Sequence, residues 1–585
     1  MNVISRPRHD VQDVAASWLK SFANALQSDD AVAAARHFAH EGHWRDVLAF
    51  TWRIGTATGA AAIEAALAPT LVRTVPRDFQ IPAGRSAPRR VKRAGVDCIE
   101  AIFEFDTAFG RANGVVRLVE EDGEWRIWTL LTTLEELRGY PDGRPRAMSD
   151  AEKFSRDFGG ENWLDQRRKV LAYADRDPAV LIVGGGQAGL SAAARLNHLG
   201  VDTLIIDRNQ RIGDNWRLRY HSLTLHNEVH VNHLPLMPFP PTWPVFIPKD
   251  KLANWFETYV DSLELNYWTG TELAAGSWDD KQKRWTVTLR RSDGSERTMK
   301  PRHIVVATGV SGIPIWPKVP GLDSFKGEIM HSGQYTSGVA WKGRKAMVIG
   351  TGNSGHDVAQ DLCASGVDTT IVQRSPTYIV SIREAQKVYA TYSEGLPFED
   401  CDLLACSMPY PVLRRAYQLS TAEMREVDRK LLEGLEKRGF RLTFGEDDTG
   451  FQMMYLRRGG GYYFNVGCSD MIIDGRVGLL QYDAIDRFVP QGVVLKDGTT
   501  RPLDLVVVAT GYETQQEFVR QTLGDDVADR IGPVWGFNDG GELRNMWGPT
   551  PQEGLWFTAG SLAQCRIYSR YLALQIKARE DGLIK

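Results

Sequence analysis

The sequence predicts an α/β protein with two parallel-sheet units, preceded by a separate α+β unit. Two observations predict the parallel sheets: strand-like apolar runs alternate with helical patterns from Ala179 onward, and one glycine-rich motif occurs twice. A third observation predicts the α+β unit: helical patterns are followed by long strand-like runs within residues 10–138. A chain of 585 residues is too long for a single core, which agrees with several domains.

The composition excludes several classes of function. The formal net charge of −3 offers no basic surface for nucleic acid or for an anionic membrane. No apolar run is as long as a membrane helix, and the first residues lack the apolar segment of a secretory signal. The six cysteines are scattered without a C-x-x-C pair. This spacing favours a reducing, cytoplasmic location and argues against a disulfide reductase.

The predicted α+β unit covers residues 10–138. Apolar periodicity and β-rich runs predict helices at Val11–Leu26 and Asp30–Phe38, and strands at Cys98–Phe109, Ala112–Glu120 and Trp125–Leu134. This order resembles the NTF2-like (SnoaL-like) α+β cone. Such cones can be catalytic through an Asp/His pair, and the available residues here are His37, His40, His43 and Asp46. Surface histidines and a structural aspartate are the simpler interpretation. The unit could instead mediate a homodimer or shape the entrance of the catalytic part.

A dinucleotide-binding motif follows a linker and helix expected over residues 139–178. An apolar strand pattern leads into Gly184, Gly186 and Gly189, and a helical pattern comes next. In a Rossmann-type unit the first glycine permits a tight turn, the second admits the pyrophosphate, and the third lets the helix pack on the strand. Asp207 ends the next strand at the spacing of a ribose-binding carboxylate. We therefore expect a first dinucleotide site here.

The second motif differs from the first at one informative position. Gly350, Gly352 and Gly355 repeat the glycine pattern, but the following strand ends in Arg374 and Ser375 rather than an acid. An arginine accommodates the 2′-phosphate of NADPH, whereas a carboxylate repels it. The second site should therefore bind NADPH, and the first is the better place for FAD. A solvated surface arginine is the alternative interpretation of Arg374.

Three further strand ends complete the expected nucleotide sites. Two apolar strands close on Ala-Thr-Gly, at Thr308–Gly309 and Thr510–Gly511, and a third strand leads to Gly560. The repeat suggests that the chain leaves the FAD domain and re-enters it around an inserted NADPH domain. The predicted boundaries are 179–335 for the first part of the FAD domain, 336–500 for the NADPH domain and 501–585 for the second FAD part. The N-terminus of a helix expected at Ile567–Arg579 could face the flavin.

The residues from about Val180 to Arg579 resemble class B flavin monooxygenases. The segment Arg208–Trp216 is similar to the one that follows the ribose acid in that family, and Asp504–Glu513 matches its A-T-G-Y region. Phe325–Tyr335 matches the fingerprint F-x-G-x-x-x-H-x-x-x-[YF] and lies between the two glycine motifs, as in the family. Tyrosine at its end resembles flavin-containing monooxygenases more than Baeyer–Villiger enzymes. The run before His226 is most similar to the YUCCA-like and bacterial branch.

The resemblance implies that NADPH reduces FAD, that O2 forms a C4a-hydroperoxyflavin, and that one oxygen atom passes to a small molecule. The substrate would be an amine or sulfide, or a carbonyl or 2-oxo acid. Four residues are the candidate catalytic residues: His226, Asn227, Tyr335 and His331. An asparagine of the animal enzymes would fall at His226, and Asn227 is adjacent. The expected cofactor-binding residues, besides the glycines named above, are Gln187, Ala188, Asp207, Arg208, Gly213, Asn215, Trp216, Thr308, Gly309, Asn353, Ser354, Arg374, Ser375, Thr510, Gly511 and Gly560.

Several alternatives stay open at this point. His221, His226, His230 and His233 are irregularly spaced, so no metal site is expected. Residues 396–470, with a helix expected at Ser420–Arg438 after a capping-box pattern, could cover the substrate pocket or form a structural subdomain. An NADPH-dependent flavin oxidase or reductase with a partner-binding N-terminal unit is the alternative to a monooxygenase. The F-x-G-x-x-x-H motif favours the monooxygenase.

Overall fold

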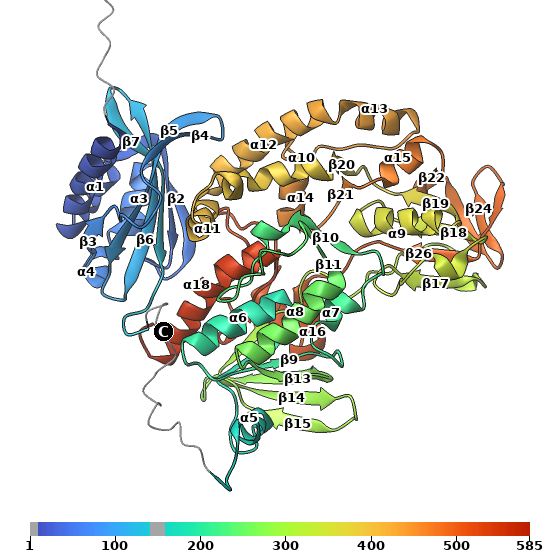
Figure 1. The fold of residues 1–585 in the computed structure, drawn as a ribbon, viewed down its shortest axis with the longest axis horizontal. Coiled ribbons are helices and arrows are strands. Elements are labelled where there is room, and N and C mark those ends of the chain that lie inside the picture. The colour runs from blue at the N-terminus through green and yellow to red at the C-terminus, as the bar shows by residue number, and fades with distance from the viewer. Residues whose placement is uncertain (1–9, 141–157, 585) are drawn as a thin grey trace, which may run out of the picture.

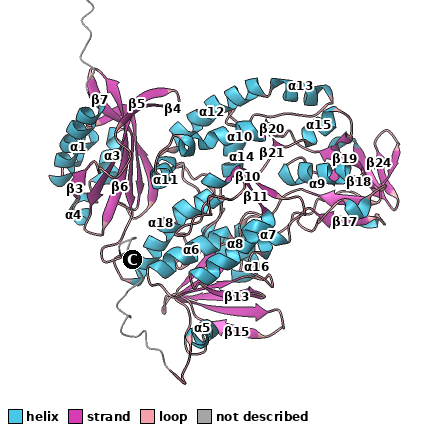
Figure 2. Cartoon of the chain, in the orientation of Figure 1, coloured by secondary structure: helices cyan, strands magenta, loops and turns pink. Residues whose placement is uncertain are grey.

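A computed structural model describes residues 10–140 and 158–584 of the chain (Figure 1). Residues 141–157, which make up most of the predicted Pro/Gly-rich linker, lie outside the described residues. The predicted mixed α/β architecture is confirmed, because helices cover several separate sheets (Figure 2). No described helix is both long and apolar enough to cross a membrane.

The N-terminal unit packs short helices against a seven-stranded sheet of order β2-β1-β7-β6-β5-β3, with β4 paired to β5. Figure 1 shows this unit beside the rest of the molecule, next to α11 and α18. Its helices are α1 (Val11–Gln27), α2 (Ala31–Ala35), α3 (Ala60–Leu67) and α4 (Leu71–Thr74). Its strands are β1 (Phe38–Val47), β2 (Ile54–Thr58), β3 (Arg77–Gln80), β4 (Arg89–Arg93), β5 (Val96–Asp106), β6 (Arg111–Glu121) and β7 (Glu124–Leu134).

Three predicted strands and the first helix are confirmed in this unit, but the second helix is shorter than expected. It ends at Ala35 because Phe38 already begins β1, a strand that the sequence pattern did not reveal. Strand β1 pairs in parallel with β7, and it buries Arg45 and Asp46 as well as its apolar residues. Buried charges hide the alternation by which a strand is recognised. Their burial depends on partners far away in the chain.

The first parallel sheet has the order β12-β9-β8-β16-β27. Numbered along the chain, this is 3-2-1-4-5, the order of doubly wound dinucleotide-binding sheets. Helices α6 and α18 pack together over it. The elements are β8 (Val180–Val183), α6 (Gln187–His198), β9 (Thr203–Ile206), β12 (Asn266–Trp268), β16 (His303–Val306), β27 (Leu555–Phe557) and α18 (Leu562–Glu580). Before the fourth strand the chain forms an antiparallel sheet of β13 (Thr271–Asp279), β14 (Arg284–Arg291) and β15 (Glu296–Met299).

The second parallel sheet repeats this plan. Its order, β22-β19-β18-β26, is again 3-2-1-4, with β17 added at the edge. The elements are β17 (Glu328–His331), β18 (Lys345–Ile349), α9 (Asn353–Ala364), β19 (Asp368–Gln373), β22 (Val477–Gln481) and β26 (Leu505–Val508). A second antiparallel excursion precedes the fourth strand: β23 (Ile485–Val489), β24 (Gly492–Leu495) and β25 (Thr500–Pro502).

Sheet membership moves two of the predicted domain boundaries. Strand β17, expected in the first domain, pairs with β26 in the second sheet. Strand β26 was expected in the returning part of the first domain, yet it lies between β17 and β18. The second sheet therefore extends from residue 328 to residue 508, rather than from 336 to 500. Both Ala-Thr-Gly strands are fourth strands, one in each sheet, and this explains why they look alike.

A helical segment lies between β19 and β22, the second and third strands of the second sheet. It contains β20 (Tyr378–Ser381), α10 (Ile382–Ala385), the 3₁₀ helix η5 (Gln386–Ser393), α11 (Phe398–Cys406), α12 (Tyr410–Val427), α13 (Arg429–Lys437), α14 (Gly450–Arg458), β21 (Tyr462–Asn465) and α15 (Cys468–Ile473). The helix predicted over 420–438 is present as the end of α12 and the whole of α13, but the predicted start at Ser420 is wrong. Ser420 lies inside α12, and the break falls at Asp428 instead, whose carboxylate accepts a hydrogen bond from the Ser381 N–H.

The remaining α-helices and β-strands precede the first sheet or lie between its strands in the chain. They are α5 (Trp163–Ala172), α7 (Asp214–Arg217), β10 (Thr224–Glu228), β11 (Phe246–Pro248), α8 (Lys249–Ser262), α16 (Gln515–Leu523) and α17 (Asp525–Ile531). Helix α5 confirms the helix expected before the first sheet and begins at a capping box on Asn162. Helix α18 starts five residues earlier than expected, because Ser561 and Gln564 form a capping box there.

Candidate active site

One large cleft receives the carboxyl ends of both parallel sheets. Its volume is ≈3250 Å³, several times the roughly 300–1,000 Å³ of a pocket for one drug-sized ligand. The cleft therefore has room for more than one ligand. Besides the sheets, the helical segment around α11 and α12 and the N-terminal unit contribute to its wall.

The first glycine motif forms a cradle that only glycine can build. Gly184 has a φ of +108°, and a Cβ atom there would lie 2.6 Å from the Ala307 carbonyl oxygen. A Cβ atom at Gly189 would lie 2.0 Å from the Gly184 carbonyl oxygen. Any larger residue would therefore prevent helix α6 from packing closely against the turn after strand β8. Helix α6 begins at Gly186 without a side-chain cap. Its first N–H groups are therefore available to an anion, as a pyrophosphate requires.

Asp207 stands at the end of β9, beside this cradle. Its carboxylate accepts hydrogen bonds from the N–H groups of Gly185 and Asn209, each at 2.8 Å, and lines the cleft. These bonds fix its orientation. Trp216 donates to Gln187 at 3.2 Å, and Gln187 donates to the Gly560 carbonyl at 3.3 Å. This chain of bonds joins three predicted cofactor-binding residues around the cradle.

The second cradle has the same kind of backbone geometry as the first. Gly350 has a φ of +122°, and a Cβ atom there would lie 2.3 Å from the Ala509 carbonyl oxygen. A Cβ atom at Gly355 would lie 2.1 Å from the Gly350 carbonyl oxygen. Helix α9 begins at Gly352, again without a side-chain cap. The geometry of the residues present thus fits a dinucleotide phosphate at each cradle.

The end of β19 differs from the end of β9 as the sequence predicted. Arg374 and Ser375 are exposed and line the cleft. Within residues 10–140 and 158–584, the Arg374 guanidinium makes no hydrogen bond or ion pair, whereas the Asp207 carboxylate is held by two hydrogen bonds. An unpartnered guanidinium beside a phosphate cradle is free to bind an added phosphate.

Most of the other predicted cofactor residues also line the cleft, and two, Gly189 and Gly213, do not. The lining includes Gln187, Ala188, Arg208, Asn215, Trp216, Thr308, Gly309, Asn353, Ser354, Thr510, Gly511 and Gly560. Gly189 and Gly355 act through packing, and Gly355 also reaches the cleft. Gly213 is buried with a φ of +86°, and a Cβ atom there would lie 2.4 Å from the Ala253 carbonyl oxygen. It therefore allows α7 to pack on α8.

His331 and Tyr335 lie behind the cleft rather than on its wall. Both are fully buried. The His331 ring lies 3.2 Å from the Gly511 carbonyl through Nε2, and its Nδ1 accepts from the Gly333 N–H. Tyr335 donates to Asp361 of α9 at 2.6 Å. Both side chains thus support the second cradle from behind, which is a positioning role.

His226 and Asn227 lie on β10 and line the cleft. The His226 ring is accessible from the cleft and packs against Phe464, with ring centroids 4.7 Å apart. Desolvation deep in the cleft lowers the pKa of His226 to about 4, so the ring is neutral at physiological pH. Asn227 donates from Nδ2 to the Tyr389 hydroxyl at 3.2 Å and is nearly buried.

The sequence did not single out two tyrosines of the cleft wall. Tyr389 and Tyr417 belong to η5 and α12, whose patterns give no functional signal. The Tyr455 hydroxyl of α14 donates to the side-chain oxygen of Gln564 of α18 at 3.2 Å. Tyr389, Tyr417, Tyr455 and Gln564 all line the cleft. Burial raises the pKa of each of these tyrosines, so they stay neutral. The segment 396–470, expected either to cover the pocket or to be structural, contributes cleft-lining residues.

The candidate residues of the N-terminal unit serve the fold. Asp46 is buried and accepts hydrogen bonds from Thr51 and Thr132 at 2.7 Å each, besides two backbone N–H groups. His43 pairs with Thr58 at 2.9 Å. The cavity inside the unit measures only ≈10 Å³, about the volume that one water needs. The structural interpretation of Asp46 is supported. Among described residues, no group of three His, Cys, Asp or Glu side chains could hold a metal.

A family model of flavin-binding monooxygenase-like proteins matches residues 177–532, more than half of the chain. The chain belongs to the flavin-binding monooxygenase-like family. The matched region contains both glycine cradles, β10 and the helical segment. The predicted class of enzyme, a flavoprotein monooxygenase, is thereby confirmed at the level of the family.

Relatives and solved structures agree with this family. Indole-3-pyruvate monooxygenase YUCCA1 of Oryza sativa subsp. japonica is 30% identical over 349 residues, covering 60% of this chain and 80% of that protein. The probable indole-3-pyruvate monooxygenase YUCCA10 of Arabidopsis thaliana is 29% identical, over 58% of this chain and 82% of its own. Cyclohexanone monooxygenase from Rhodococcus sp. Phi1, solved with NADP+, shares the fold: the TM-score is 0.50 at 18% identity, over 70% of this chain and 85% of that one.

The flavin-binding monooxygenase-like proteins depend on FAD and NADPH, and these are the cofactors of this chain. Both cofactor predictions are confirmed. The geometry agrees, because two cradles of the same construction open on one cleft and two uncapped helix N-termini face it.

Proposed function

We propose that the protein is an NADPH-dependent FAD monooxygenase that inserts one atom of O2 into a small organic molecule. One observation carries this proposal: both cradles open on one cleft, and the cleft continues into a wall of neutral histidine, asparagine and tyrosine side chains. The two cofactors and a substrate could thus be held together in one cleft that excludes water.

Each cradle is proposed to hold one cofactor within a Rossmann-type unit. FAD fits the Gly184 cradle, because Asp207 is oriented to accept hydrogen bonds from a ribose and would repel a 2′-phosphate. NADPH fits the Gly350 cradle, because Arg374 is unpartnered and stands at the end of the second strand. When bound, FAD supplies the activation of O2 and NADPH supplies the electrons.

The chain's own groups orient the reactants and exclude water. Asn227 is held by Tyr389, so its amide has a fixed direction at the cleft wall. His226 is neutral and can exchange a hydrogen bond without adding charge near a reduced flavin. The cleft lining near them is aromatic, with Phe464, Tyr417 and Tyr455 among its residues. This lining favours apolar or aromatic substrates, such as sulfides, tertiary amines or ketones.

The N-terminal unit is proposed to be an NTF2-like domain, on the strength of its helix-covered seven-stranded sheet. The homodimer that such a unit could mediate stays a prediction.

Labelled oxygen tests the proposed function. The purified protein is supplied with NADPH, ¹⁸O2 and, in turn, an aryl sulfide, a tertiary amine and a cyclic ketone. We expect one labelled oxygen atom in a product for each NADPH consumed, with little hydrogen peroxide. Stoichiometric peroxide and no labelled product across the whole panel would contradict a monooxygenase and favour an NADPH oxidase.

A further inference from the structure

The N-terminal unit is bound to the rest of the chain by charged side chains that are largely buried. Arg45 of β1 makes a bidentate ion pair with Glu542, at 2.8 and 2.7 Å, and donates to the Cys406 carbonyl. Asp400 of α11 accepts from Arg85 at 2.8 Å and from the Ser86 hydroxyl at 2.6 Å. Buried charges tolerate little displacement, because a lost partner leaves a desolvated charge. These buried charges therefore favour a single position of the N-terminal unit against the rest of the chain.

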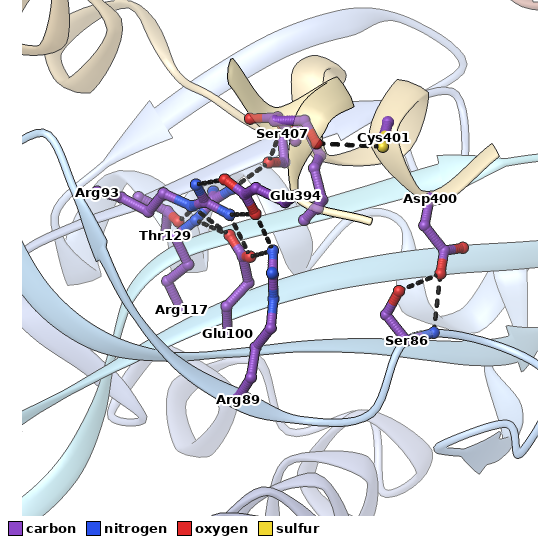
Figure 3. Close-up of polar contacts among 12 residues, drawn as sticks. Ser86, Arg89, Arg93, Glu100, Arg117, Thr129, Glu394, Asp400, Cys401 and Ser407 are labelled. Atoms are coloured by element: carbon purple, nitrogen blue, oxygen red, sulfur yellow. Dashed lines mark hydrogen bonds and ion pairs between the residues drawn. The ribbon is translucent and has the colours of Figure 1, made fainter. Parts of the chain in front are cut away.

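The centre of this contact is an arginine cluster around Glu100 (Figure 3). Arg89, Arg93 and Arg117 each bind the Glu100 carboxylate, at 2.8, 2.7 and 2.8 Å. Glu100 and Arg117 are almost fully buried, and the guanidinium neighbours hold the pKa of Glu100 at about 2. The three arginines outnumber their shared acid. Their surplus positive charge faces the catalytic part of the molecule.

The three arginines also bind acceptors in the segment 386–407, which comprises η5 and α11. Glu394, just after η5, accepts from Arg93 at 2.6 Å and from Arg89 at 2.7 Å. At the end of α11, the Ser407 hydroxyl accepts from Arg117 at 2.8 Å. One side of the segment is thus fixed to the N-terminal unit at Glu394, Asp400 and Ser407, as Figure 3 shows.

The other side of the same segment holds β10, the strand of the candidate active-site residues. Gln386 donates to the His226 carbonyl at 2.8 Å and accepts from the Glu228 N–H at 3.3 Å. Tyr389 accepts from Asn227. Residues of the N-terminal unit also lie on the cleft wall itself, among them Arg93 and Arg117. A short run of chain therefore links the arginine cluster to the active-site wall.

We propose that the N-terminal unit is a positioning element of the monooxygenase: Arg89 and Arg93 fix the segment 386–407 through Glu394, and this segment holds Tyr389 against Asn227 and closes the substrate end of the cleft. This inference rests on the proposed function. In this proposal the binding partner of the N-terminal unit is the segment 386–407 of the same chain. The unit's interior, filled by aromatic side chains, has no room for a substrate of its own.

The test changes the charge at one residue and measures the segment directly. In Glu394→Arg, the new guanidinium faces Arg89 and Arg93. Glu399→Arg instead changes an exposed residue of α11 that makes no hydrogen bond or ion pair with the described part of the chain. Amide hydrogen exchange is followed in the FAD-loaded full-length protein. We expect exchange in residues 386–407 to rise about tenfold in Glu394→Arg, which corresponds to about 1.4 kcal/mol of lost local stability. Glu399→Arg should leave it unchanged.

A second measurement connects the segment to the cleft. Without added substrate, NADPH-dependent release of hydrogen peroxide reports how well the cleft is closed around the reduced flavin. We expect Glu394→Arg and Tyr389→Phe each to raise this release severalfold, and the double variant to exceed neither single variant by much, because both act through the same contact. Glu394→Gln should show a smaller rise in the same direction.

The outcomes separate this inference from the proposed function. Unchanged hydrogen exchange in Glu394→Arg overturns the positioning role, whatever the labelled-oxygen experiment shows. Raised exchange with unchanged peroxide release, or fully additive effects of Glu394→Arg and Tyr389→Phe, overturns the link to the cleft. A protein that forms no labelled product but shows raised exchange would contradict the monooxygenase while retaining the docked segment.

Discussion

The two glycine cradles have the same backbone and different surroundings. Both place a glycine of positive φ against the carbonyl before the Thr-Gly of a fourth strand, and both open an uncapped helix toward the cleft. They differ at the end of the second strand, where Asp207 is fixed by two N–H groups and Arg374 is free. The shared backbone therefore fits phosphate binding in general, and we propose that the side chain at the end of the second strand selects the dinucleotide.

The helices behind the cradles also differ. At the position where α9 carries Asp357, α6 carries the buried Ser191. Asp357 accepts a hydrogen bond from Tyr220 at 2.5 Å, and Asp361, one turn later, accepts from Tyr335 at 2.6 Å. Tyr220 lies between β9 and β12 of the first sheet, whereas Tyr335 lies between β17 and β18 of the second sheet. The Tyr220–Asp357 hydrogen bond therefore ties the helix of the second cradle to the first unit.

Filling the cradles should have the largest effect. Gly184→Ala would force a Cβ against the Ala307 carbonyl, and Gly350→Ala would do the same against Ala509. We expect Gly184→Ala to be isolated largely without FAD. Gly350→Ala should keep its flavin spectrum but reduce it with NADPH more than about tenfold more slowly, since a strained backbone clash exceeds 1.4 kcal/mol. Flavin absorbance and the rate of reduction are the measurements.

A glycine away from the cradles provides the control. Gly200, after α6, also has a positive φ of +72°, but a Cβ atom there meets nothing within 4 Å. Gly200→Ala should alter stability without altering either cofactor. Loss of flavin from Gly350→Ala, or equal loss from all three variants, would contradict the assignment of one cofactor to each cradle.

Arg374→Ala should have the next largest effect, and only with one nucleotide. A charge-assisted hydrogen bond to a phosphate contributes about 1.5–3 kcal/mol, so the KM for NADPH should rise roughly 10- to 100-fold. The KM for NADH should change little. Arg344→Ala, at an exposed arginine that starts the same sheet and pairs with Asp504, is the matched control. Equal changes with NADPH and NADH would rule out the 2′-phosphate contact.

The smallest expected effect concerns pH. Burial raises the pKa of Asp357 to about 6, and the bond from Tyr220 lowers it. Because the folded pKa is above the unfolded value, the stability that Asp357 contributes is present at low pH and lost as pH rises through about 6. Ionisation near the α9 N-terminus should also weaken NADPH binding over this range.

Removing the tyrosine hydroxyl sharpens this prediction. Tyr220→Phe should shift the midpoint of the pH dependence of NADPH binding upward, by up to about one unit, because a donor to the carboxylate is lost. Asp357→Asn should abolish the dependence near pH 6. If Asp357→Asn retains the full dependence, another group is responsible. FAD binding, at the cradle whose helix carries no carboxylate at this position, should not follow the same curve.

The predicted and observed structures agree best where function needs neighbouring residues. Strand, glycines, helix and the next strand end form each cradle within about 30 residues, so Asp207 and Arg374 could be placed beside their cradles from the sequence. The failures arise where long-range contacts decide. Strand β1 is not apparent because its Arg45 is buried by Glu542, and the helix break at Asp428 depends on the Ser381 backbone.

The sequence by itself determined the two nucleotide cradles, their difference in charge and the monooxygenase family, because phosphate binding uses local backbone geometry and a few side chains nearby in the chain. Tertiary structure alone decided that the second Ala-Thr-Gly strand belongs to the second sheet and that His331 and Tyr335 support the cleft from behind. It also decided which residues line the cleft. Asn227 meets Tyr389, and Glu394 meets Arg93, across segments that are far apart in the chain, and such contacts carry no signature in a sequence read in order.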